Sequence, residues 1–243
     1  MRIKEILTPQ LTVHFLVIAV LSISTAQAIA APTVAANCEN IQILSEQLST
    51  REAEAYCSYA VIERQKVERF WGATWKEPIR IHVDRSYRIS RALVPAYHGN
   101  RGFMEMPLGR VRNNEGALLH EIVHIYAPNE NRFLAEGLAV YLHHRLAGNK
   151  AFPNFGKSLD TEARGRLSQL ESLDGLNSVR TPQPLGRVLG EQSAYVLAGS
   201  FVGFLMEKYG LPEFRTLYES GRYESAYGKP LETLEKEWRA ALQ

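Results

Sequence analysis

The sequence contains little cysteine: Cys38 and Cys57 are the only two among 243 residues. Their spacing fits no cysteine-based metal motif, which excludes a metal site built on thiolates. In an oxidising compartment a single pair of this kind can form one disulfide. We therefore expect a Cys38–Cys57 disulfide, with two free buried thiols as the alternative.

The chain also has almost no excess of charge of either sign, because 28 basic residues are balanced by 26 acidic ones to give a net charge of +2. So mild a balance gives no support for a polyanionic partner, and we predict no nucleic-acid binding. Internal repeats and low-complexity segments are absent as well. The 45% hydrophobic and 22% charged residues are typical of a soluble globular protein, long enough for one domain with a real core.

Long apolar runs are missing after the N-terminus, so we predict no stable membrane span in the mature chain. The N-terminus carries Arg2 and Lys4, then an apolar stretch from Leu11 to Ile23, then small-x-small sites around Ala28. This order is typical of a signal peptide. We predict a signal peptide over residues 1–30 and a periplasmic or extracellular protein, with an uncleaved membrane anchor as the alternative.

Residues 31–243 are predicted to form a single domain of the α+β class, in which a small strand region precedes a mostly helical half. An N-terminal helical extension is expected over about 37–71, because apolar residues recur at helical spacing in 37–49 and in 51–71. Alternating Ile79, Ile81 and Val83 predict a strand, and 103–106 a second one. Further helices are expected from Asn113 or Asn114 to just before Pro128, and over 133–146, 161–173, 192–209 and 231–242, with a long loop over 174–189.

The segment from His120 to His124 reads HEIVH, an HExxH pattern. On a helix, residues four apart lie on the same face, so both imidazoles can reach one metal ion. Glu121 lies off that line and can act on a water at the metal. Two solvated histidines on an amphipathic helix are the alternative, which fits poorly because the surrounding residues are apolar. The pattern therefore predicts one Zn²⁺ ion bound by His120 and His124.

Catalytic zinc takes three protein ligands and keeps one position open. Ala127 and Glu130 stand where a metzincin would need Gly and His, so that arrangement is excluded. Glu136 is the best candidate for the third ligand, since a cation facing it would explain a carboxylate within the apolar segment Phe133–Leu142. A salt bridge from Glu136 to Arg132 is the alternative. Glu130, in a polar turn, is a weaker candidate ligand.

Two residues near Glu136 carry further expectations. Gly137 would allow the preceding helix to approach closely. His143 lies on the same helical face as Glu136, although a solvated pair with His144 is the simpler interpretation.

These motifs resemble those of the peptidase MA-like zinc metallopeptidases of the gluzincin type, which occur in extracytoplasmic proteins. The resemblance rests on HEIVH at 120–124 and FLAEGLAVYL at 133–142, and extends to 193–195, 201–205, 208–210 and 231–238. It covers the chain from about Pro78 to the end. It implies a zincin-like fold with HEIVH on an active-site helix and Glu136 on a following glutamate helix.

The resemblance also implies an activity: an exported zinc-dependent metallopeptidase that hydrolyses peptide bonds in peptide or protein substrates. Glu121 would act as general base on a zinc-bound water, and Tyr195 would stabilise the oxyanion, with Tyr141 in reserve. Gly102–Met106 would be the edge strand that pairs with an extended peptide. A non-catalytic, zinc-stabilised binding domain is the alternative, against which the intact Glu121 argues.

Seven arginines make the segment before the active-site helix basic: Arg80, Arg85, Arg88, Arg91, Arg101, Arg110 and Arg112. They could favour acidic substrates, although a solvated strand surface balanced by acids elsewhere is the simpler interpretation. Together with Tyr87 and Tyr97 they suggest nucleic-acid binding only weakly, because the net charge is mild.

Overall fold

The computed structural model describes residues 33–93 and 102–243. The predicted signal peptide lies outside the described residues, as do Tyr97 and Arg101 of the basic segment. Among the described residues, no helix combines the length and the apolar character that crossing a membrane requires.

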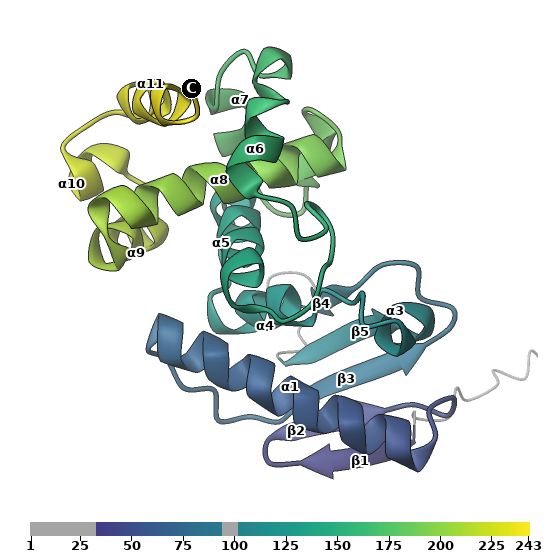
Figure 1. Ribbon diagram of the computed structural model, residues 1–243. Coiled ribbons are helices and arrows are strands. Elements are labelled where there is room, and N and C mark those ends of the chain that lie inside the picture. The colour runs from purple at the N-terminus through teal and green to yellow at the C-terminus, as the bar shows by residue number, and fades with distance from the viewer. Residues whose placement is uncertain (1–32, 94–101) are drawn as a thin grey trace, which may run out of the picture. The chain divides into compact units, whose positions relative to one another are not determined.

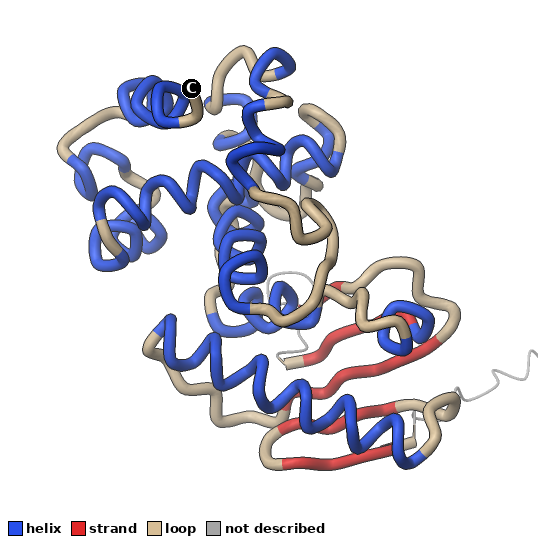
Figure 2. The backbone as a smooth tube through the Cα atoms, in the orientation of Figure 1, coloured by secondary structure: helices blue, strands red, loops and turns tan. Residues whose placement is uncertain are grey.

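In the described part of the chain, five strands form one mixed sheet in the order β1-β2-β3-β5-β4. Their bounds are β1 (Val34–Cys38), β2 (Ile41–Leu44), β3 (Ile79–Asp84), β4 (Arg91–Leu93) and β5 (Phe103–Pro107). Strands β2, β3 and β5 run parallel, whereas the outer strands β1 and β4 run antiparallel to their neighbours. Both strands expected from the sequence are confirmed, and Figure 2 shows the sheet gathered in one half of the molecule.

The helix expected over 37–49 is wrong, because this segment belongs to the hairpin of β1 and β2. Ile41, Leu44 and Leu48 have helical spacing, but Ile41 and Ile43 are both fully buried and repeat with the period of a strand. A strand of four residues is too short for periodicity to decide between the two structures. The predicted helical extension therefore begins only with the next element.

Helix α1 (Thr50–Trp71) confirms the helix expected over 51–71. It begins with a capping box between Ser49 and Glu52, and it ends at Gly72, which adopts the left-handed conformation at φ 67°. Figure 1 shows α1 lying across the sheet beside β1 and β2. The expected disulfide is present, since Cys57 on α1 is bonded to Cys38 on β1 with their Cα atoms 6.1 Å apart.

Two short helical elements follow the sheet, α3 (Leu108–Arg112) and α4 (Leu118–Tyr126). The expectation that Asn113 or Asn114 caps the active-site helix is wrong. Asn113 ends α3, and Asn114 has φ 54°, a left-handed conformation that asparagine tolerates better than most residues. Helix α4 therefore begins later than expected, at Leu118, and all nine of its residues are buried.

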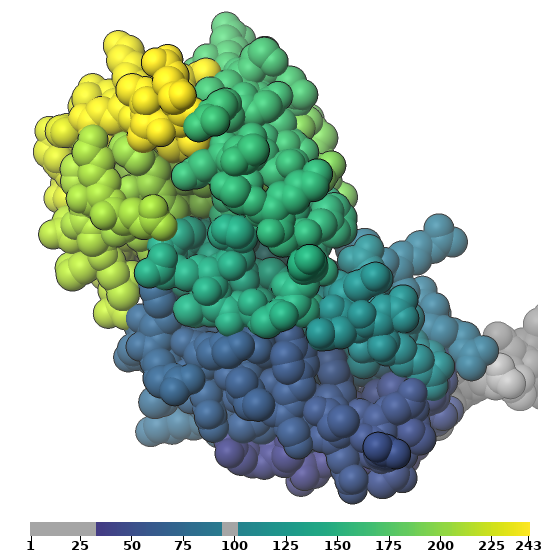
Figure 3. Space-filling model, in the orientation of Figure 1, coloured from purple at the N-terminus to yellow at the C-terminus, as the bar shows by residue number. Residues whose placement is uncertain are grey.

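The second half is helical, as expected, and follows the sheet half in the chain. In Figure 3 the colours of the two halves occupy separate parts of the molecule. It contains α5 (Arg132–Leu146), α6 (Leu159–Arg164), α7 (Asp174–Asn177), α8 (Glu191–Tyr209), α9 (Leu211–Ser220), α10 (Tyr223–Tyr227) and α11 (Leu231–Ala241). The helix expected over 161–173 is shorter, and the expected loop 174–189 includes α7. The protein thus has the predicted α+β class, a small mixed sheet followed by a mostly helical half.

Helices α5 and α8 touch through glycines. A Cβ atom at Gly137 would lie 2.7 Å from the carbonyl oxygen of Ala198, and one at Gly199 would lie 2.4 Å from Cγ1 of Val140. The expectation that Gly137 admits the preceding helix is therefore wrong, because the helix that approaches it is α8. This contact fixes the position of α8 relative to α5, which carries Glu136.

Candidate metal centre

Helices α4 and α5 bring three predicted ligands to one point. His120 and His124 lie one turn apart on α4, and their Nε2 atoms are 3.1 Å from each other. Glu136 on α5 directs Oε2 between them, 3.0 Å from Nε2 of His120 and 3.4 Å from Nε2 of His124. Among the described residues, this is the one group of three or more His, Cys, Asp or Glu side chains arranged closely enough to bind a metal ion.

The three ligand atoms have the spacing that a tetrahedral zinc site requires. Zinc bonds to imidazole nitrogen and carboxylate oxygen measure about 2.0–2.1 Å, so tetrahedral ligand atoms lie about 3.3 Å apart. Within the described part of the chain, no donor makes a hydrogen bond to the buried Oε2 atom of Glu136. A buried carboxylate oxygen without a donor is costly unless a cation faces it. The donor set therefore fits a divalent ion.

Glu136 forms the alternative salt bridge and also faces the two histidines. Arg132, four residues earlier on α5, donates to Oε1 of Glu136, whereas Oε2 faces the two histidines. Burial raises the pKa of Glu136, but the nearby positive charges of His124 and Arg132 outweigh it and hold the pKa well below its usual range. The two histidines and Arg132 together keep Glu136 ionised, and the bond from Arg132 to Oε1 orients its carboxylate.

Glu121 faces the cleft without joining the three-residue cluster. Its Oε2 atom accepts a hydrogen bond of 2.7 Å from the backbone N–H of Ala92 in β4. Burial raises the pKa of Glu121 to about 7, His120 opposes this shift, and the neighbouring Glu136 adds to it. A carboxylate with such a pKa can take up a proton near neutral pH.

Tyr195 on α8 comes to the same place from the helical half. Its ring lies parallel to that of His120, with centroids 6.3 Å apart and an angle of 10° between the planes. The ring of Phe152 packs edge-on against the ring of Tyr195, and their centroids are 5.6 Å apart. Burial raises the pKa of Tyr195 well above its usual value, so its hydroxyl stays protonated and can donate a hydrogen bond.

These residues line a cleft of about 450 Å³. One wall includes residues of β4, of α3 and of the start of α4, among them Ala92, Arg110 and Ala117. Phe152, Pro182, Pro184 and Tyr195 from the helical half also line it. The volume is within the range of small-molecule and peptide sites.

The strand beside the cleft differs from the expected one. Strand β5, which contains Phe103–Met106, lies between β3 and β4, so the outer strand is β4. Strand β4 could not be predicted from the sequence because it has only three residues, of which Leu93 alone is buried. Its contribution to the site, the N–H of Ala92, is a backbone group that no side-chain pattern reveals.

Other candidates lie elsewhere. Glu130 is exposed and outside the cluster, and the hydroxyl of Tyr141 donates to Glu207 at 3.3 Å. His143 is buried with only 4% of its surface exposed, so the solvated pair with His144 is wrong. His143 does not line the cleft.

No family model and no curated protein sequence matches the chain. Among solved structures, it is similar to a mutant M1 zinc metallopeptidase from Deinococcus radiodurans, with 19% identity and a TM-score of 0.47 over 83% of this chain and 47% of that one. It is also similar to a mutant two-domain M1 zinc metallopeptidase bound to L-arginine, with 18% identity and a TM-score of 0.46 over 83% and 46%. The chain thus spans about half the length of these structures. At such scores the likeness carries no weight for the chemistry, which depends on the geometry of the site.

Proposed function

We propose that this protein is an exported zinc-dependent metallopeptidase that hydrolyses peptide bonds. The observation that carries the proposal is the convergence of His120 Nε2, His124 Nε2 and Glu136 Oε2 within 3.0–3.4 Å of one another. Three ligands from HExxH and a following helix leave one position open, which is the arrangement of a catalytic rather than a structural zinc site.

One Zn²⁺ ion would be held by His120, His124 and Glu136. When bound, it supplies Lewis-acid chemistry, since it acidifies water and polarises a carbonyl group. Arg132 supports the site from behind Glu136, because its pairing with Oε1 leaves Oε2 for the ion.

Glu121 is the proposed general base. Its carboxylate accepts the proton of the attacking water and returns it to the leaving amine. The N–H of Ala92 holds that carboxylate over the cleft through a 2.7 Å hydrogen bond. Because the bond comes from the outer strand, the base is positioned by the same strand that borders the substrate cleft.

Tyr195 and β4 are the proposed contacts to the substrate. The protonated hydroxyl of Tyr195 would donate a hydrogen bond to the oxyanion that develops on the substrate carbonyl. Among the described strands β4 is the outer one, so β4 replaces Gly102–Met106 as the proposed strand for an extended peptide.

Residues 1–30 are proposed as the signal peptide and 31–243 as the mature single domain. The Cys38–Cys57 disulfide supports export, because such bonds persist in oxidising compartments outside the cytoplasm.

The test is the zinc content of the purified mature protein, with Glu136→Ala and Glu121→Gln variants prepared in the same way. We expect nearly one zinc per chain in the parent and in Glu121→Gln, and little in Glu136→Ala. Digestion of a peptide library, followed by mass spectrometry, then tests cleavage by the parent and its loss in Glu121→Gln. Bound zinc without cleavage would instead indicate a zinc-stabilised binding domain, and a parent that takes up no zinc would refute the proposal.

A further inference from the structure

We propose that Arg110 recognises a carboxylate of the substrate, so that the cleft selects peptides carrying an acidic side chain or a free C-terminal carboxylate. The inference rests on the proposed function for the kind of ligand, a peptide. The carboxylate is the chemical group by which Arg110 would select that peptide.

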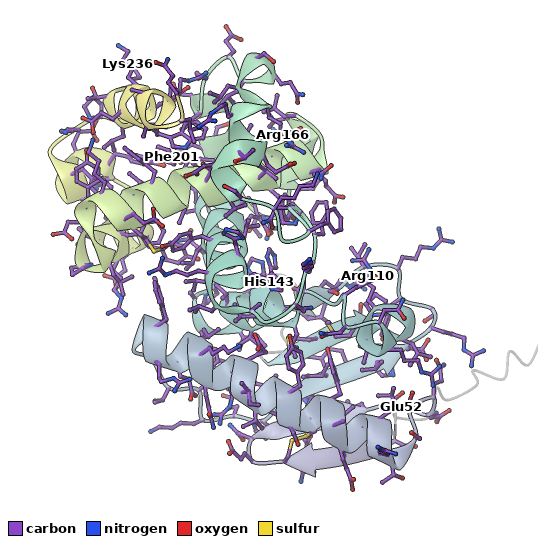
Figure 4. The ribbon with its side chains drawn as sticks, viewed as in Figure 1. Glu52, Arg110, His143, Arg166, Phe201 and Lys236 are labelled. Atoms are coloured by element: carbon purple, nitrogen blue, oxygen red, sulfur yellow. A yellow bond between two sulfur atoms is a disulfide. The ribbon has the colours of Figure 1, made fainter. Side chains whose placement is uncertain are left out.

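Within the described residues, Arg110 forms no ion pair, unlike the other arginines of the cleft. Arg91 pairs with Glu105, and Arg132 pairs with Glu136. In the two described ranges, 33–93 and 102–243, no acidic group forms an ion pair with Arg110. Its side chain is nevertheless half-buried and lines the cleft. Figure 4 shows Arg110 beside the short helix α3. A cation that is partly removed from water gains more from an anionic ligand than a fully solvated one does.

The position of Arg110 suits contact with a bound peptide. Arg110 lies on α3 and lines the cleft together with Ala92 of β4 and Ala117, the residue before α4. A peptide paired with the edge of β4 would therefore pass close to its guanidinium group. Guanidinium matches a carboxylate with two parallel hydrogen bonds, which gives both affinity and orientation.

The charge of the whole cleft acts in the same direction. Three arginines and three glutamates line it: Arg91, Arg110, Arg132, Glu121, Glu136 and Glu191. These charges balance, so a bound divalent cation leaves the cleft net positive. A positive cleft attracts anionic ligands and repels cationic ones.

A matched control lies two residues away on the same short helix. Arg112 donates to Oε1 of Glu52 at 2.9 Å and to the backbone oxygen of Gln47 at 2.9 Å. It does not line the cleft. Replacing Arg112 removes the same charge from α3 without touching the proposed contact.

The test measures peptide binding to the zinc-loaded full chain in a Glu121→Gln background, which prevents turnover. The probes are decapeptides of Gly, Ala and Gln in three sets, labelled at the N-terminus with an uncharged boron-dipyrromethene dye. One set has a single Glu at each position in turn and an amidated C-terminus, the second has no Glu and a free C-terminal carboxylate, and the third is neutral. Fluorescence anisotropy gives each affinity in the background protein and with Arg110→Gln, Arg110→Lys or Arg112→Gln added.

We expect a peptide from the first or second set to bind about ten- to hundredfold more tightly than the neutral peptide, because charge-assisted hydrogen bonds contribute this much. Arg110→Gln should abolish the preference, Arg110→Lys should retain part of it, and Arg112→Gln should leave it unchanged. The set that binds identifies the source of the carboxylate. Equal binding of all sets, no binding of any, or a preference that survives Arg110→Gln would overturn the proposal.

Failure of the proposed function is recognised separately, from zinc content and library digestion. A protein that prefers the acidic peptide through Arg110 but cleaves nothing contradicts the peptidase and leaves the carboxylate site standing. A protein that cleaves peptides with no dependence on Arg110 supports the peptidase and contradicts the carboxylate site.

Discussion

At the scale of single residues, the hydroxyl of Tyr195 is the group whose role is most directly testable. Tyr195→Phe keeps the ring beside His120 and removes only the donor. We expect kcat to fall about 100- to 1000-fold with little change in KM, as for loss of one oxyanion donor. Steady-state kinetics on a peptide that the parent cleaves provide the measurement, and zinc content should stay the same.

Tyr141→Phe is the control for this prediction. The hydroxyl of Tyr141 donates to Glu207 and lies outside the cleft lining, so its removal should leave kcat within about twofold of the parent. A larger loss in Tyr141→Phe than in Tyr195→Phe would reverse the assignment of the two tyrosines.

We expect His143 to make the stability of the protein depend on pH. Burial lowers its pKa from 6.5 to about 3, and nearby His120, His144 and Lys66 contribute to the shift. Between these values the unfolded state binds more protons than the folded state, so stability is complete above about pH 6.5 and is lost as the pH falls toward 3. At about 1.4 kcal/mol per pH unit, the loss is roughly 4 kcal/mol by pH 3.

Urea unfolding of the metal-free protein at several pH values tests this prediction, with a chelator present so that metal release does not contribute. His143→Leu replaces the buried imidazole, labelled in Figure 4, with an apolar side chain that does not titrate. The free energy of unfolding of the variant should depend less on pH than that of the parent between pH 4 and 6.5. Equal slopes for the two proteins would show that His143 is not the cause.

At the scale of helices and strands, the contact of α5 with α8 connects folding to the site. Gly137→Ala would place a methyl group 2.7 Å from the backbone oxygen of Ala198, which cannot move as a flexible side chain does. We expect a loss of about 1–3 kcal/mol in stability, as for other overpacked interiors. Cleavage should fall too, because α8 carries Tyr195 and α5 carries Glu136. Thermal unfolding and peptide cleavage measure the two effects.

Gly148→Ala is the matched control, since a Cβ atom there meets nothing within 4 Å. Its stability should stay within about 0.5 kcal/mol of the parent, as for most surface substitutions. If Gly137→Ala is equally neutral, the two helices are not held by this contact.

The sequence was most informative where an element is long or its pattern is repeated. Helix α8 and the alternating strand β3 were predicted closely because many residues carry the same signal. The hairpin of β1 and β2 and the three-residue β4 were misassigned or missed, because short strands offer too few residues to separate a period of 2 from one of 3.6. The start of α4 was misplaced because Asn114 adopts a turn conformation rather than a cap.

For the site, the order of residues sufficed to name the three clustered side chains. Spacing within HEIVH defines the two histidines, and an acid in an apolar helix is conspicuous. The N–H of Ala92 and the packing of Phe152 could not be predicted, since both depend on segments distant in the chain that only tertiary structure brings together. From the sequence, a salt bridge to Arg132 and a metal ligand are alternative roles for Glu136. In the structure the salt bridge to Arg132 coexists with the three-residue cluster.

At the scale of the whole molecule, a bound metal would link the consecutive helices α4 and α5, which belong to different halves of the protein. His120 and His124 belong to α4, beside the sheet, and Glu136 belongs to α5, in the helical half. Binding to the folded state alone stabilises it by about 2.7 kcal/mol when the free metal is at 100 times its Kd. For a chain of this size that corresponds to a rise of roughly 5–10 °C in Tm.

Calorimetric scans with added zinc and with a chelator test this expectation. The parent should unfold at a lower temperature after chelation, and the difference should vanish in Glu136→Ala. A Tm that ignores zinc in the parent would argue against a site that joins α4 to α5.

The Cys38–Cys57 bond has a consequence for biosynthesis. Both cysteines precede every residue of the His120, His124 and Glu136 cluster in the chain. If the chain is exported as proposed, synthesis from the N-terminus lets this pair be oxidised before the proposed metal ligands have emerged. With two cysteines in the whole sequence, only one intramolecular pairing exists. On that proposal, maturation would need an oxidant but no isomerase, and metal would be loaded afterwards, onto a scaffold whose disulfide is already closed.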